Sequence, residues 1–460
     1  MVYFFIVFDI YLTLRRHTLS TTDNHPKNLS TKRIFATWLP LVASWLLMSI
    51  ELPTINAIVA RLPNPEVNLA AYGGVVFPVA LTIEAPVIML LAAATALSRD
   101  WRSYQRLKKI TLWMGGILAA VHLLVAVTPI YDVIVNVILQ VPEAVVEPGR
   151  SGLLFLTPWT IAIAYRRFQQ GTMIRFGHSR MVGETTAIRL VTGVAILLIG
   201  LRLGTIPGAT LAGLTQGLAV TAEAIYAGLR IRKIRPLIKD APTAQQPLTL
   251  KRFTAFYLPL ALTSSLWLLW LPLISGTVSR MPNPLESLAV WSVVTGLLFM
   301  FRTPGVAYNE AVVALLEEPC AFPILKKFAR NAALVTAVLA AAFVISPLSS
   351  GWFRVIANLP PDMADTARIT LAFAVPLAIL SVYISLFQGI IVQQEKTGPV
   401  AEAVVVFLIA LGAVLIAGVV TEAYKGVYVA AAGFTFAHLM QGLWLLIRSR
   451  KQRQVLAICS

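Results

Sequence analysis

The chain has 460 residues, of which 57% are hydrophobic and 13% are charged, and its formal net charge is +17. Together with a mean hydropathy of +0.76, this composition is that of a polytopic membrane protein and excludes a large soluble domain. Lys and Arg concentrate in alternate loops, as the positive-inside rule requires, so the charge orients the protein in a membrane and does not indicate nucleic acid. The two cysteines, Cys320 and Cys459, cannot supply a disulfide framework.

Residues 1–33 begin with an apolar run that is too short to span a membrane and lacks the basic start of a signal peptide. We predict a cytoplasmic or interfacial segment there. The next stretch, 34–60, is long enough to cross a hydrocarbon core of about 30 Å at about 1.5 Å per residue. Pro53 should kink this helix. Glu51 lies beside the kink, where a charge is costly, and is therefore a candidate ion- or substrate-binding residue.

Eleven further stretches of spanning length follow, and the loops between them, such as the basic segment 166–180, alternate in charge. The predicted fold class is an all-α polytopic membrane protein with 12 transmembrane helices, and an even count places both termini in the cytoplasm. A basic linker at 230–252 separates an N-lobe at 34–229 from a C-lobe at 253–447, and a basic tail occupies 448–460. The predicted spans are residues 34–60, 69–97, 110–130, 151–168, 183–203, 206–229, 253–279, 287–316, 328–347, 369–392, 400–420 and 427–447.

The two predicted lobes repeat one another. The loop at residues 280–284, Arg-Met-Pro-Asn-Pro, lies 219 positions after the loop at residues 61–65, Arg-Leu-Pro-Asn-Pro. After a one-residue slip between the first and second spans the offset is 218, and Pro86 then matches Pro304. Because each copy has six spans, both enter the membrane from the same side. The repeat is therefore predicted to be parallel, with a pseudo-twofold axis along the membrane normal and a binding cleft between the lobes.

Two matched positions within the repeat carry opposite charges. Glu84 lies near the middle of the second span, and its equivalent in the eighth span is Arg302. A buried charge is costly, so each residue needs a partner or water. Two interpretations stay open: an ion pair or substrate contact between the lobes that changes during transport, or a permanent partner on neighbouring helices.

Other polar side chains extend this set of candidates. Asn309 lies on the same helix face as Arg302, and Glu310 lies within about a quarter turn of that face.

Glu223 in the sixth span matches Gln441 in the twelfth, and is either a coupling or substrate carboxylate or a hydrogen-bonded structural acid. His438 could titrate near neutral pH, with a satisfied core histidine as the alternative. His122 is interpreted as structural, and Arg189 is close enough to the end of its span to snorkel.

A series of short sequence words resembles the progressive ankylosis (ANK) family, in the MATE-like branch of the multidrug/oligosaccharidyl-lipid/polysaccharide exporter superfamily. The likeness extends loosely over residues 34–450, and it implies an exporter of small anions such as pyrophosphate, nucleoside phosphates or citrate. It also implies an acid on the eighth span, which Glu310 matches. The seventh span departs from the family, because Trp267 and Trp270 stand where charged residues would be expected. The words are Leu69-Ala70-Ala71-Tyr72-Gly73, Ser98-Arg99-Asp100, Ala119-Ala120-Val121-His122, Phe256-Tyr257-Leu258-Pro259-Leu260-Ala261-Leu262 and Val278-Ser279-Arg280.

The chain contains no phosphate-binding loop, no metal-ligand spacing and no nucleophile elbow. We therefore expect neither an enzyme nor a cofactor or metal site. The predicted function is secondary-active export of a small anion by alternating access of the two lobes, in the plasma or inner membrane, with H⁺ or Na⁺ as a possible coupling ion.

Several alternatives to this function stay open. Acids outnumber bases within the predicted spans, which suits a proton- or sodium-coupled cation or drug antiporter. A lipid-linked glycan flippase and a membrane scaffold or receptor are the further alternatives. The expected partners are the substrate, a possible coupling ion and membrane lipid. We expect no nucleic-acid partner, and we expect the protein to be a monomer.

Overall fold

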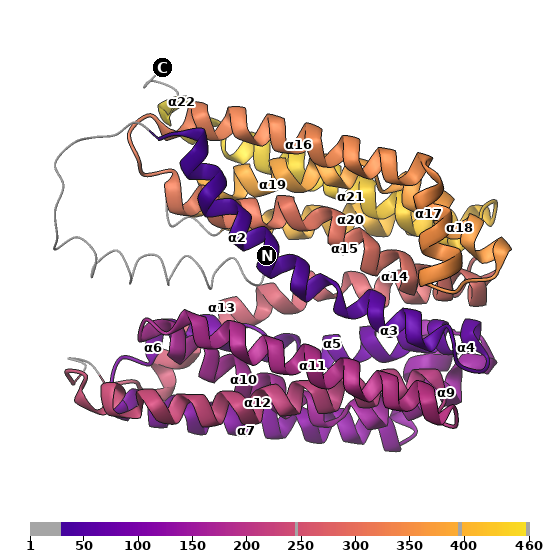
Figure 1. Cartoon of the computed structure of the whole chain (residues 1–460), viewed down its shortest axis with the longest axis horizontal. Coiled ribbons are helices and arrows are strands. Elements are labelled where there is room, and N and C mark those ends of the chain that lie inside the picture. The colour runs from indigo at the N-terminus through magenta and orange to yellow at the C-terminus, as the bar shows by residue number, and fades with distance from the viewer. Residues whose placement is uncertain (1–28, 244–246, 394–397, 457–460) are drawn as a thin grey trace. The chain divides into compact units, whose positions relative to one another are not determined.

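The computed structural model describes residues 29–243, 247–393 and 398–456, and all regular structure within these ranges is helical (Figure 1). The predicted segment 1–33 lies almost wholly outside the described residues. Contacts divide the chain into two compact units. Of the described residues, unit 1 comprises Arg61–Pro272, and unit 2 comprises residues 29–60 together with those from Leu273 onward.

In unit 1, the helix α10 contacts α6, α7 and α12, and so lies at the centre of the packing. Two irregular turns, the π-helix η1 and the 3-10 helix η2, interrupt its second predicted span. The elements of this unit are α4 (Pro65–Ala71), η1 (Tyr72–Val76), α5 (Phe77–Glu84), η2 (Ala85–Val87), α6 (Leu90–Leu97), α7 (Trp101–Val127), α8 (Ile130–Asp132), η3 (Val133–Leu139), α9 (Glu143–Leu156), α10 (Pro158–Arg175), α11 (Ser179–Leu203), α12 (Gly208–Asp240) and α13 (Leu250–Leu268).

In unit 2, the long helix α15 packs against α19, α2 and α18. The elements of this unit are α2 (Thr31–Ser49), α3 (Glu51–Val59), α15 (Pro284–Leu315), α16 (Ala321–Ile345), α17 (Pro347–Gly351), η4 (Trp352–Ile356), α18 (Pro361–Phe373), α19 (Pro376–Gln393), α20 (Gly398–Thr421), α21 (Gly426–Arg448) and α22 (Arg450–Leu456), and α14 (Trp270–Val278) begins at the unit boundary.

The contacts group the first helix of each copy differently from the predicted lobes 34–229 and 253–447. The first predicted span packs in unit 2, where Trp38 Nε1 donates to Pro304 O at 2.9 Å. The seventh packs in unit 1, where Ser264 Oγ donates to Ala85 O at 2.8 Å. Sequence could not show this, because a helix that is apolar on most sides carries no record of which neighbour it packs against.

The sequence repeat is visible inside each unit as coincident helix ends. Both ends of α10 and α19 match at the offset of 218, and both ends of α2 and α13 match at the offset of 219. Asn64 and Asn283, which precede α4 and α15, both adopt left-handed backbone conformations, with φ of 52° and 54°. Both first helices also break at equivalent residues, Ile50 and Leu269. Each break falls three residues before a proline, which cannot donate to the carbonyl four residues back.

The one-residue slip lies inside the second span, and not between the first and second spans as predicted. Pro65 and Pro284 still match at an offset of 219, whereas Pro86 and Pro304 match at 218, so unit 1 has one extra residue between them. The π-helix η1 absorbs it, since Phe77 N–H bonds to Tyr72 O, five residues back. A π-turn is the expected result of inserting one residue into an α-helix.

Within the described part of the chain, ten helical segments are long and apolar enough to cross a membrane. The predicted fourth and sixth spans, 151–168 and 206–229, are helical but do not meet this criterion. They form α9, α10 and α12, and α10 and α12 carry the buried Arg166, Arg167 and Glu223. The chain is therefore a multi-pass membrane protein with two unusually polar helices in one of its units.

Candidate functional site

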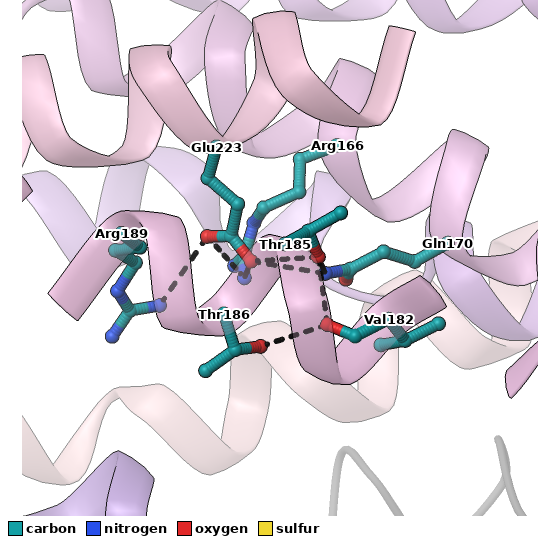
Figure 2. Close-up of polar contacts among 7 residues, drawn as sticks. All are labelled: Arg166, Gln170, Val182, Thr185, Thr186, Arg189 and Glu223. Atoms are coloured by element: carbon teal, nitrogen blue, oxygen red, sulfur yellow. Dashed lines mark hydrogen bonds and ion pairs between the residues drawn. The ribbon is translucent and has the colours of Figure 1, made fainter. Parts of the chain in front are cut away.

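A cluster of buried polar side chains joins α10, α11 and α12 in unit 1 (Figure 2). Arg166 Nη1 lies 3.0 Å from Glu223 Oε2, and the two side chains are 3% and 0% exposed. Arg189 Nη1 lies 3.9 Å from the same carboxylate oxygen. Gln170 Nε2 donates to Glu223 Oε1 at 3.0 Å and lies 2.9 Å from Thr185 Oγ1. Glu223 is therefore held by two cations and an amide.

Of the two interpretations of Glu223, these contacts fit that of a hydrogen-bonded structural acid. An ion pair with both members buried is costly to break, because removing one partner leaves the other charge uncompensated. The geometry therefore ties three helices of unit 1 together, and it leaves the Glu223 carboxylate with little freedom to serve as a mobile ligand.

The basic side of this cluster was not predicted from the sequence. Arg166 and Arg167 stand where the predicted span 151–168 meets the basic segment 166–180, whereas α10 continues to Arg175 and buries both, at 3% and 6% exposed. The buried side chains of unit 1 therefore include two bases that the sequence had not indicated, and one of them, Arg166, faces a buried acid.

Glu84 belongs to a second buried group in unit 1, on the last turn of α5. Its Oε1 lies 2.7 Å from Thr160 Oγ1 on α10, and the same hydroxyl lies 2.8 Å from His122 Nδ1 on α7. His122 Nε2 lies 3.0 Å from Leu153 O on α9. Glu84 and His122 are both 0% exposed. Glu84 thus has partners on neighbouring helices of its own unit.

Arg302 has a different environment, on α15 in unit 2. Its Nη2 lies 2.7 Å from His438 Nε2, and its guanidinium carbon lies 5.4 Å from the centroid of the Phe434 ring. His438 Nδ1 lies 2.8 Å from Phe434 O, an acceptor, so Nδ1 carries the hydrogen and Nε2 accepts from Arg302. His438 is therefore a neutral acceptor in this arrangement. No ion pair to Arg302 occurs among the described residues.

Arg302 also lines a narrow crevice in unit 2. The crevice has room for about one water molecule, and its other walls are apolar, from Leu298, Ala340, Leu371 and Leu377 among others. Arg302 thus borders a gap whose other walls are apolar.

The remaining predicted site residues are dispersed in unit 2. Glu310 Oε1 accepts from Trp45 Nε1 at 3.0 Å, and Asn309 Nδ2 donates to Ser385 O at 3.0 Å. Neither is hydrogen-bonded to Arg302 in the described part of the chain, although all three share α15. Gln441 is buried on α21, and Glu51 is half-buried at the start of α3. The structure therefore brings together Arg302 and His438, and it places Glu310 and Asn309 against Trp45 and Ser385.

The fold defines a class of protein. No protein-family model matches the chain, and no curated protein matches it in sequence. Solved structures do match: an inward-facing multidrug resistance MATE family transporter of the MOP superfamily has 13% identity and a TM-score of 0.59, with 98% of each chain covered. The eukaryotic MATE transporter AtDTX14 has 12% identity and a TM-score of 0.61 over 92% of this chain and 99% of its own.

A third neighbour has a pocket of unusual polarity. It is a MOP superfamily transporter from Pyrococcus furiosus whose binding pocket is described as having reverse polarity. It has 15% identity and a TM-score of 0.60 over 91% of this chain and 96% of that chain. The chain therefore has the fold of the MATE transporters, and the predicted all-helical fold class is confirmed. The ANK branch stays a prediction.

Proposed function

We propose that this chain is a secondary transporter that exports a small anion from the cell by alternating access of its two lobes. The observation that carries the proposal is the state of Arg302. It is a cation on a membrane-spanning helix whose contacts among the described residues are a neutral histidine and an aromatic ring, with no carboxylate to balance it. Such a charge is costly in a membrane and marks a ligand pathway by default.

The buried acids give a weaker argument for a cation substrate than the sequence suggested. Glu223 is neutralised by Arg166 and Arg189. Glu84 and Glu310 each contact a hydrogen-bond donor, and neither forms an ion pair among the described residues. These two carboxyls are the observation that favours the second candidate, a proton- or sodium-coupled cation or drug antiporter.

The chemistry of the substrate follows from a guanidinium, which binds carboxylate and phosphate oxygens through paired donors. A phosphate or carboxylate anion fits it, as the ANK resemblance implies for pyrophosphate, nucleoside phosphates or citrate. The binding pocket of the Pyrococcus furiosus neighbour is described as having reverse polarity. This supports the idea that pockets of opposite charge can be built on the same fold. We further propose that the protein works as a monomer in the plasma or inner membrane with both termini in the cytoplasm.

Flux in reconstituted vesicles tests this proposal. Vesicles holding radiolabelled pyrophosphate, ATP or citrate, and a parallel set holding a cationic dye, are compared for the wild type, Arg302→Ala and Arg302→Lys. We expect anion efflux that Arg302→Ala abolishes and Arg302→Lys partly retains. Arg354→Ala is the matched control, because Arg354 is 49% exposed and paired with Asp365. Efflux of the dye without any anion flux, or anion flux that survives Arg302→Ala, would overturn the proposal.

A further inference from the structure

Glu84, Thr160 and His122 form a continuous buried chain of a carboxyl, a hydroxyl and an imidazole. The two links measure 2.7 Å and 2.8 Å, and the outer nitrogen of the imidazole ends at a backbone carbonyl 3.0 Å away. Thr160 is also 0% exposed, so the hydroxyl between the two titratable groups is as buried as they are. We propose that this group is a proton-binding site that holds one exchangeable proton, shared between Glu84 and His122 through Thr160.

The count of hydrogens leads to this conclusion. Leu153 O can only accept, so His122 Nε2 carries a hydrogen in every arrangement. Thr160 has one hydroxyl hydrogen, and it can give that hydrogen either to Glu84 or to His122 Nδ1, but not to both. Whichever residue does not receive it must itself donate to the Thr160 oxygen, and so must be protonated.

Two arrangements satisfy both links. In the neutral one, Glu84 is a carboxylic acid that donates to Thr160, and Thr160 donates to an unprotonated Nδ1 of His122. In the ionic one, His122 is an imidazolium that donates to Thr160, and Thr160 donates to a Glu84 carboxylate. The two contain the same number of protons. Two concerted transfers through the Thr160 oxygen interconvert them, with no net gain or loss of protons and no heavy atom displaced.

Removing one proton breaks the chain. A Glu84 carboxylate beside a neutral His122 leaves two acceptors for the single Thr160 hydrogen, so one link is lost and an anion is left in a buried site. Glu84 Oε2 has no hydrogen-bond partner among the described residues, so no second donor offsets that charge. The site therefore retains its proton until water or a cation reaches it.

Groups on other helices set the balance between the two arrangements. Arg166 on α10 attracts the Glu84 carboxyl electrostatically, and this favours the ionic arrangement. Burial away from water favours the neutral one. Tyr257 on α13 donates to Pro86 O on the turn that follows Glu84, and Arg167 in turn acts electrostatically on Tyr257. A change in these contacts would therefore shift the equilibrium between the neutral and the ionic arrangement.

The repeat shows that this site is particular to one copy. At the offset of 218, the positions in unit 2 equivalent to Glu84, Thr160 and His122 are Arg302, Ala378 and Ala340, and none of them can join a carboxyl–imidazole chain. The fold is therefore built in unit 2 without this group. If the site binds an exchangeable proton, that proton is the coupling ion for export, and this consequence rests on the proposed function.

Spectroscopy tests the site independently of any substrate. Infrared spectra of the purified protein report the C=O stretch of a protonated carboxyl, and ¹⁵N NMR of labelled histidine reports the tautomer of His122, one of five histidines in the chain. We expect a buried-carboxyl band in the wild type that disappears in Glu84→Gln and moves in Thr160→Val. Thr160→Ser, which keeps the hydroxyl, should restore the wild-type band. Glu310→Gln, which removes a buried carboxyl of unit 2, should leave the Glu84 band in place.

The outcomes separate the site from the transport function. Absence of any band assigned to Glu84, with His122 neutral across the pH range, overturns the inference. The same holds if His122 carries its hydrogen on Nδ1 and has a bare Nε2. In vesicles, Glu84→Gln should lose pyrophosphate efflux driven by a pH gradient and keep gradient-free exchange. Retained pH-driven efflux would overturn the coupling role. A clear Glu84 band without any anion flux in the wild type would instead overturn the proposed function and leave the proton site standing.

Discussion

Arg166 and Glu223 form an ion pair from which solvent is excluded, with 3.0 Å between Nη1 and Oε2 and side chains that are 3% and 0% exposed. The equivalent positions in unit 2, at the offset of 218, are Ile384 and Gln441. One copy of the repeat thus carries a buried pair of charges where the other has an uncharged pair. Unit 2 builds the same helices without the charges, so the six-helix architecture does not require them.

Breaking this pair should be more harmful than removing it. Glu223→Gln leaves Arg166 buried without its carboxylate, and we expect a loss of about 3–5 kcal/mol in the free energy of unfolding. The double variant Arg166→Ile/Glu223→Gln copies the residues of unit 2 and should recover much of that loss. Thermal unfolding of the purified protein in detergent measures both. If the loss in the double variant equalled the sum of the losses in Glu223→Gln and Arg166→Ile alone, the two residues would not interact.

A second prediction concerns the close contact of α10 with α6 at Gly171. A Cβ atom there would collide with Leu91 O and would lie 2.7 Å from Ala94 Cβ, both of which belong to a helix that cannot yield locally. Overpacking a buried contact typically costs about 1–3 kcal/mol, and we expect Gly171→Ala to reach the upper end of that range in thermal unfolding.

The repeat supplies the controls for Gly171. At the equivalent Gly389, a Cβ would meet the Val312 side chain, with Cγ1 at 2.7 Å, so Gly389→Ala should cost less if that side chain can rotate away. At Gly116 on α7 nothing lies within 4 Å of the added atom, so Gly116→Ala should be neutral or slightly stabilising. Equal losses at Gly171 and Gly116 would contradict the prediction.

Helix ends and the repeat could be predicted from the sequence because the residues that set them are visible there. Proline removes a backbone donor wherever it stands, so Pro53 indicated a kink in the first span, and the helix breaks three residues before it, at Ile50. The repeated loops 61–65 and 280–284 were predicted to lie between the first and second spans of each copy, and α4 and α15 begin at the last residue of each loop. These signals act on the backbone within a few residues of where they stand, so they can be recognised without knowing the tertiary structure.

The partners of buried polar groups could not be predicted in the same way. Thr160 has no distinguishing signal in an apolar run, yet it links Glu84 to His122. Arg166 and Arg167 were counted with the basic segment 166–180, at the end of the predicted span 151–168, and not as buried residues. The repeat did indicate a longer helix. The tenth span, which is the copy of the fourth, was predicted to run to residue 392, and this corresponds to residue 174, well past both arginines.

The last prediction concerns the extra residue in η1. Deleting Gly74 should convert the π-turn into continuous α-helix, as in α15, but it would rotate α4 by about 100° and shift it by about 1.5 Å relative to α5. Asn68 on α4 accepts the N–H of Ala209 at 2.9 Å, and its own amide donates to Pro63 O at 3.0 Å. Because Pro63 moves together with α4, its bond to Asn68 should survive, whereas the deletion should break the buried bond to Ala209 and lower the free energy of unfolding by about 1–3 kcal/mol.

A compensating insertion checks whether register is the cause. Adding one alanine between Val79 and Ala80 restores the number of residues between α4 and η2, and should return part of the lost stability by bringing Asn68 back to Ala209. Thermal unfolding of the deletion and of the compensated variant decides the matter. If the deletion alone leaves the melting temperature unchanged, the π-turn does not set the register of the second span, and the extra residue must be absorbed without disturbing Asn68.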